Sequence, residues 1–117
     1  MPHPLDIVVA DILEAIEQAS SFVRGMSFAQ YCTDLKTQRA IERTLEVISE
    51  ASRHIPAGVK KKHPSIPWKN VAGIGDIMRH DYRSIANKVI WDTVCERLPE
   101  LEKTMLEIRA ELGSSGG

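Results

Sequence analysis

The stretch VCERLPELEKTMLEIRAEL, residues 94–112, indicates the fold of this chain more clearly than any other part of it. Its apolar residues recur at spacings of 4, 3, 4, 3 and 4, which is the period of one face of an α-helix; they are Val94, Leu98, Leu101, Met105, Ile108 and Leu112. Because a proline kinks the interior of a helix but suits its first turn, Pro99 predicts a break. We therefore expect one helix over residues 90–97 and a second over residues 99–112.

The same helical period recurs upstream, and no alternating apolar and polar run is long enough to predict a strand. We expect further helices over residues 5–24, 28–32, 34–55 and 68–82, with Ser27 capping the second and Thr33 or Asp34 capping the third. Residues 56–67 are expected to form a loop. The sequence thus predicts an all-α fold, an antiparallel bundle of four to five helices, in a single domain over residues 1–112 with a flexible tail over 113–117.

The composition limits the classes of function that the chain can have. It has 117 residues, with 15 Lys plus Arg against 16 Asp plus Glu, so the net charge of −1 excludes a globally basic protein that coats nucleic acid. No run approaches the roughly 20 apolar residues of a membrane span, and the N-terminus lacks a signal peptide. Cys32 and Cys95 lie in apolar helical patterns, so we expect reduced core residues of a cytoplasmic protein.

The densest group of chemically capable side chains is DIMRHDYR, residues 76–83. On a helix, Asp76, Arg79, His80 and Arg83 fall within an arc of about 100°. An imidazole can accept or donate a proton near neutral pH, a neighbouring carboxylate can orient it, and guanidinium groups suit a phosphate. The tyrosine hydroxyl of Tyr82 can position a substrate. This edge could do phosphodiester chemistry; the alternative is a solvated helix face with weak ion pairs.

Other chemistries find little support in the sequence. The histidines show no metal-ligand spacing, and no glycine-rich phosphate loop or serine or cysteine nucleophile motif is present. We therefore expect no metal and no cofactor. The run Lys60-Lys61-Lys62 is either part of a solvated loop or an electrostatic collar for an anionic partner.

Several stretches together resemble the HepT-like family of the HEPN superfamily. They are IPWKNVAG at residues 66–73, RHDY at 79–82, VIWDTV at 89–94, LPEL at 98–101 and, upstream, ISEA at 48–51. The resemblance extends from about residue 5 to residue 112. It implies an all-α bundle that forms a homodimer, in which Glu50 of the upstream element braces the motif helix; a surface carboxylate is the alternative for this residue.

The resemblance also implies an activity and a partner. The family's best understood members are ribonuclease toxins of bacterial toxin–antitoxin pairs, which cleave RNA without a metal. Their partner is an MNT-type nucleotidyltransferase antitoxin that transfers AMP to the tyrosine of a His-x-Tyr motif. Carried over to this chain, His80 is the motif histidine and Tyr82 the modified tyrosine.

In the family, four to six residues separate the arginine from the motif histidine, and at the corresponding positions this chain has Gly73, Ile74 and Gly75. Arg79 lies directly before His80 instead. Three hypotheses follow: a ribonuclease that uses Arg79 or Arg83, a non-catalytic binding module that docks a nucleotidyltransferase, and a plain helical dimerisation protein.

Overall fold

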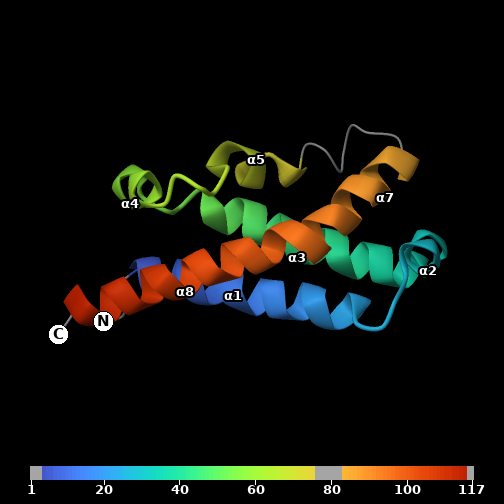
Figure 1. Ribbon diagram of the computed structural model, residues 1–117, viewed down its shortest axis with the longest axis horizontal. Coiled ribbons are helices and arrows are strands. Elements are labelled where there is room, and N and C mark those ends of the chain that lie inside the picture. The colour runs from blue at the N-terminus through green and yellow to red at the C-terminus, as the bar shows by residue number, and fades with distance from the viewer. Residues whose placement is uncertain (1–3, 76–82, 116–117) are drawn as a thin grey trace.

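The computed structural model describes residues 4–75 and 83–115, and over these residues it is helical with no strand. The elements are α1 (Pro4–Val23), α2 (Phe28–Thr33), α3 (Leu35–Ser52), α4 (Ala57–Lys62), α5 (Trp68–Ala72), α7 (Arg83–Asp92), η1 (Thr93–Arg97) and α8 (Leu98–Ser115). The bundle is elongated, with extents of 48 × 26 × 24 Å. Figure 1 shows α1 running opposite to α3 and α8, so the predicted all-α antiparallel bundle is confirmed.

The core lies where α1 packs between α3 and α8. Each of the three helices buries one apolar stripe, and side chains that are less than 2% exposed hold its centre. From α1 these include Ile12 and Val9, from α3 Ile41, Leu45 and Ile48, and from α8 Met105 and Ile108. Burial of a large aliphatic side chain contributes about 1.5–3 kcal/mol. The stripes read from the sequence are therefore the surfaces that stabilise the fold.

The break predicted at Pro99 is a π-helical turn rather than a gap between helices. η1 spans Thr93–Arg97, and the amide of Leu98 donates to the carbonyl oxygen of Thr93, five residues earlier. A proline lacks the amide hydrogen of an α-helical turn, and its ring clashes with the carbonyl four residues before it. The wider π turn gives the ring of Pro99 space, so α7, η1 and α8 follow one another without an intervening loop.

The predicted helix caps are confirmed. Ser27 and Gln30 form a reciprocal capping box at the start of α2, and the Asp34 side chain accepts from the Thr37 amide at 3.0 Å at the start of α3. The Thr37 bond is the largest cause that lowers the pKa of Asp34 below its ordinary value. Gly25, with φ +76°, follows the end of α1 in the left-handed conformation that glycine adopts readily.

The structure corrects the boundaries of three predicted elements. Residues 57–62, expected in a loop, form α4, whose C-terminal lysines suit the negative end of a helix dipole. The helix expected over 68–82 stops at Ala72, because a turn follows at Gly73. The last helix ends at Ser115 rather than at Leu112.

The cysteines were expected in the core, and this prediction is wrong: Cys32 and Cys95 are both exposed free thiols. Each follows a residue that is buried, Tyr31 in α2 and Val94 in η1. Because successive residues of a helix differ by about 100° in direction, each cysteine points away from the core that its neighbour enters.

The connection between α4 and α5 is fixed to α8 through a buried histidine. His63 is 9% exposed, and its two ring nitrogens lie 3.6 Å from a carboxylate oxygen of Glu107 and 3.4 Å from one of Glu111. The indole nitrogen of Trp68 donates to the backbone oxygen of His63 at 3.0 Å. This one residue therefore links the start of α5 to the second half of α8.

Candidate functional site

The centre of the predicted site falls outside the described residues. Asp76, Arg79, His80 and Tyr82 all lie between Gly75 and Arg83, and the helical arc expected for them is not part of the described structure. Arg83 is the first residue of α7. What the structure does show is how the chain enters and leaves this segment.

The entry to the motif segment is anchored on α3. The carbonyl oxygen of Ala72, at the end of α5, accepts a 2.6 Å bond from the Ser49 hydroxyl and a 3.1 Å bond from the Arg53 guanidinium. Ser49 is 4% exposed and Ala72 is half-buried, so this bond is partly shielded from water. The last turn of a helix leaves its carbonyl groups without partners, and here side chains from another helix satisfy one of them.

Glu50 stands between these two donors but does not make the contact itself. Its side chain is 67% exposed, and its carboxylate lies 3.8 Å from the Arg53 guanidinium and 3.5 Å from the His54 ring. Among the described residues, the carboxylate of Glu50 pairs with Arg53 and His54, and the bracing of the motif segment by Glu50 stays a prediction. Ser49, the residue beside it, contacts the end of α5 directly, although it was not predicted as a site residue.

Two glycines shape the backbone just before the motif. Gly73 follows α5 with φ −88° and ψ 0°, and a Cβ at this position would lie 3.3 Å from the carbonyl oxygen of Lys69. Residues 74 and 75 are helical again, and Gly75 is buried. The family's arginine position is thus taken by residues of which two carry no side chain.

The exit from the motif segment is fixed by an aromatic cluster. In α7, Ala86 and Ile90 are buried, and the half-buried ring of Trp91 lies 5.5 Å from that of Tyr31 and 6.0 Å from that of Phe28. Aromatic pairs at such distances add to the area that they bury. α7 is therefore held against α2, while α5 is held against α3.

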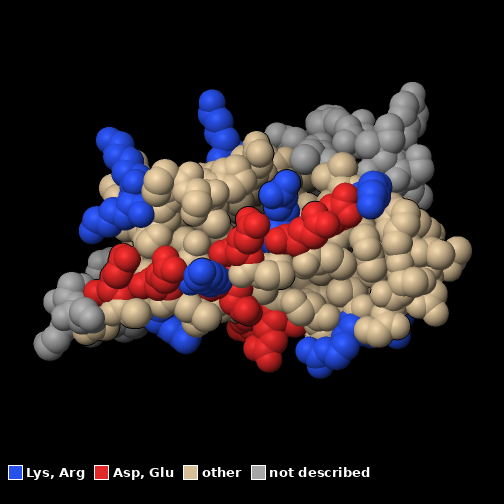
Figure 2. Space-filling model, in the orientation of Figure 1, with Lys and Arg blue, Asp and Glu red and all other residues tan. Residues whose placement is uncertain are grey.

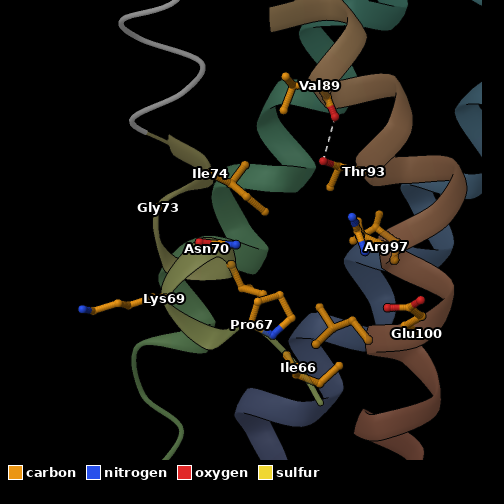
Figure 3. Close-up of a pocket in the computed structure, with 13 residues that line it drawn as sticks. Ile66, Pro67, Lys69, Asn70, Gly73, Ile74, Val89, Thr93, Arg97 and Glu100 are labelled. Carbon is orange, nitrogen blue, oxygen red and sulfur yellow. Dashed lines mark hydrogen bonds between the residues drawn. The ribbon is translucent and has the colours of Figure 1, made fainter. Parts of the chain in front are cut away.

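A cavity of about 660 Å³ lies between α5 and the helices η1 and α8. Its wall is largely aliphatic, with Ile66, Pro67, Val71, Ile74, Val89, Leu98 and Leu101. Its polar members are Lys69, Asn70, Thr93, Arg97 and Glu100. Figure 3 shows Asn70 and Arg97 on opposite sides of the cavity, whereas Lys69 points away from it.

Not every polar group of the cavity is available to a ligand. The Thr93 hydroxyl donates to the carbonyl oxygen of Val89 at 2.7 Å, so its proton is already used (Figure 3). Arg97 is exposed and makes no ion pair with any residue that the structure describes. Neither Asn70 nor Arg97 was predicted as a site residue, since Asn70 is one polar residue in a resembling stretch and Arg97 belongs to a π turn that the sequence did not predict.

Charge is unevenly distributed over the molecule. Basic side chains project from the edge formed by α4 and α5, while acidic ones gather along η1 and α8 (Figure 2). On the basic edge, Lys60 lies 5.9 Å from the ring centroid of Trp68, a cation–π distance, and Lys61 and Lys62 are exposed. The run of lysines thus belongs to a short helix, and the cavity separates this basic edge from an acidic one.

The described residues contain no group of three or more His, Cys, Asp and Glu side chains placed to hold a metal ion. None of the helices in the described ranges is both long enough and apolar enough to cross a membrane.

Comparisons with known proteins agree with the motif resemblance. The family described as "Ribonuclease HepT-like" matches residues 12–108. A protein of Thermococcus cleftensis named "Probable ribonuclease HepT" is 41% identical over 99 residues, 85% of this chain and 90% of that protein. "Putative RNase TTE0752" of Caldanaerobacter subterraneus is 38% identical over 97 residues, 83% of this chain and 87% of that protein.

"Putative RNase MJ0127" of Methanocaldococcus jannaschii is 37% identical over 105 residues, 86% of this chain and 87% of that protein. No solved structure gives a significant match. Since the matched range runs from the middle of α1 to the second half of α8, it includes most of the core, the bonds to the Ala72 carbonyl and the cavity. The chain therefore belongs to the ribonuclease HepT-like family of the HEPN superfamily.

Proposed function

We propose that this chain is the ribonuclease toxin-type subunit of a toxin–antitoxin pair, acting in the cytoplasm as a homodimer without a metal. The observation that carries the proposal is family membership over most of the chain, together with a retained His80-x-Tyr82 motif. The firmly held Ala72 at one end of the motif segment and the packed α7 at the other support it, since a catalytic segment needs rigid flanks.

The proposed chemistry is an internal transfer within RNA. The 2′-hydroxyl attacks the adjacent phosphorus, a new P–O bond forms as a 2′,3′-cyclic phosphate, and the bond to the 5′-oxygen breaks. One group accepts the proton of the 2′-hydroxyl and another donates a proton to the leaving oxygen. His80 of one copy and His80 of the second copy take these two roles across a shared cleft. Arg79 stabilises the charge on the phosphate, with Asp76 and Arg83 orienting the site.

The proposed regulation is AMP transfer to Tyr82 by an MNT-type nucleotidyltransferase. The added phosphate pairs with the arginines meant for RNA, and the adenine blocks the cleft. The chain has one other tyrosine, Tyr31, which is 0% exposed and packed against Trp91. Burial raises the pKa of the Tyr31 hydroxyl, so it is neither accessible nor readily deprotonated.

The test uses the purified chain and a single-stranded RNA in a chelating buffer. We expect cleavage that His80→Ala abolishes and that a 2′-deoxy substitution at the cleaved position blocks. Co-expression with a cognate nucleotidyltransferase should add AMP-sized mass at Tyr82 and suppress toxicity, and Tyr82→Phe should escape suppression. Mass that maps to another residue, or cleavage that survives His80→Ala, would refute these roles.

The second candidate is a non-catalytic helical dimer that serves as a binding module for a nucleotidyltransferase. The observation that favours it is the absence of arginine from residues 73–75. A stable complex with the nucleotidyltransferase, combined with no RNA cleavage by the unmodified chain, would select this function over the first.

A further inference from the structure

We propose that the cavity between α5 and η1 is a binding subsite for one nucleotide of single-stranded RNA, with Arg97 as its phosphate-binding residue. The inference rests on the proposed ribonuclease function and deepens it. It places a functional arginine in η1, outside the motif segment, and assigns a role to the cavity that this arginine lines.

The size and lining of the cavity suit a nucleotide. A volume of about 660 Å³ lies within the range of roughly 300–1,000 Å³ that small-ligand sites occupy. The aliphatic wall, which includes Ile74, Val89 and Leu101, can accept the flat face of a base. The amide of Asn70 points toward the cavity in Figure 3 and offers both donors and an acceptor to a base edge.

Arg97 supplies the charge that a phosphate needs. The lining has two cations, and Figure 3 shows that only Arg97 lies toward the cavity while Lys69 points outward. With no ion pair to a described residue, the guanidinium of Arg97 can present two parallel donors to a phosphate. Its position depends on the π turn, because one residue more per turn rotates the exposed side chains of η1 relative to an α-helix.

The charge pattern of the surface determines the path of the bound RNA over the protein. Acidic residues along η1 and α8, among them Glu96 and Glu100, repel a polyanion, whereas Lys61, Lys62 and Lys69 attract it. The backbone of the RNA therefore follows the α4–α5 edge, with Arg97 holding one phosphate from the opposite wall. Gly73 and Ile74 line the same cavity, so the next residues of the chain belong to the motif segment.

The experiment that tests this subsite measures the affinity for RNA rather than the rate of cleavage. A labelled single-stranded RNA is titrated with His80→Ala protein, which should bind without cleaving, by fluorescence anisotropy over a series of salt concentrations. Adding Arg97→Ala should weaken binding about tenfold, the loss of one charge-assisted contact. It should also reduce the slope of log affinity against log salt by about 0.7. The RNA affinity of Arg97→Lys should lie between the affinities of the His80→Ala parent and of the Arg97→Ala variant.

Arg109→Ala is the matched control, since Arg109 is an exposed arginine of α8 that does not line the cavity. It should change neither affinity nor slope. If Arg97→Ala binds like its parent while the unmutated chain still cleaves RNA through His80, the subsite is wrong and the ribonuclease function stands. If the unmutated chain neither binds nor cleaves RNA, the subsite and the ribonuclease function are both wrong. Circular dichroism of Arg97→Ala should match the parent, because the side chain is exposed.

Discussion

The side-chain hydroxyl of Ser49 donates a 2.6 Å hydrogen bond to the carbonyl oxygen of Ala72, which lies 23 residues further along the chain. This bond joins the last turn of the core helix α3 to the last residue of α5, at the entrance to the motif segment. A 2.6 Å bond that is partly shielded from water is at the strong end of those between hydroxyl and carbonyl groups. The core thereby sets where the motif segment begins.

We expect Ser49→Ala to destabilise the protein by about 1–3 kcal/mol, because the partly buried carbonyl of Ala72 loses the shorter of its two side-chain bonds. Urea unfolding followed by circular dichroism measures the change. Ser21→Ala is the matched control, since the exposed Ser21 hydroxyl bonds only to Gln18 in its own helix. Its free energy of unfolding should change by less than about 0.5 kcal/mol. Equal losses of unfolding free energy in the two variants would show that the Ser49–Ala72 bond contributes no more than an exposed bond within one helix.

Leu45→Ala should cost about 2–5 kcal/mol, since Leu45 is 0% exposed at the contact of α1 with α3 and its loss leaves a cavity. Leu35, the first residue of α3, is 55% exposed. Leu35→Ala should therefore stay close to the parent in thermal or urea unfolding. A small loss in Leu45→Ala would mean that the core collapses around the missing side chain.

The Asp34 cap predicts a specific dependence of stability on pH. Its pKa is lowered in the folded state, chiefly by the bond from the Thr37 amide, so its contribution is present above the unfolded value of about 3.9. That contribution is lost as the pH falls through the folded pKa. The melting temperature of Asp34→Asn, which keeps a capping oxygen but does not titrate, should fall less steeply between pH 5 and pH 2, roughly the range of that loss. Parallel curves for the two proteins would contradict this account.

Cys95 should react slowly with thiol reagents although it is exposed. Burial is the first cause that raises the pKa of its thiol, followed by the charges of Asp92 and Glu96. In a Cys32→Ser variant, the rate of modification by a disulfide reagent should therefore reach half its maximum above the usual value of about 8.5. A midpoint at or below that value would argue against the influence of the two carboxylates.

The sequence predicted the parts of the fold that depend on period and on local capping. The α8 stripe, with Leu98 and Met105, and the caps at Ser27 and Asp34 are as expected, because each depends on residues within a turn or two. α4 was missed because it is short and buries no side chain. No apolar period could reveal it.

The contacts around the candidate site, in contrast, could not be predicted from the sequence. The chemistry of His80 and Tyr82 could be read from residue types, but the contacts that flank them could not. Ser49 meets Ala72 across a long stretch of chain, and His63 meets Glu107 from another helix. Such pairs depend on how helices pack, which neither composition nor spacing records. The cysteines were misplaced for a similar reason, because an apolar neighbourhood in sequence does not fix which face a short helix buries.

The π turn of η1 makes chain length itself a determinant of the cavity. A π turn holds about one residue more than an α-helical turn, so deleting an exposed residue such as Glu96 would remove the extra residue that gives the ring of Pro99 its space. The side chains after the deletion would then be rotated by about 100° about the helix axis, relative to the side chains before it. A single-codon change would thus reposition the Arg97 guanidinium relative to Val89 and Thr93 without substituting any residue of the cavity wall. In relatives of this chain, the number of residues between Val94 and Leu98 is as informative about the cavity as their identity.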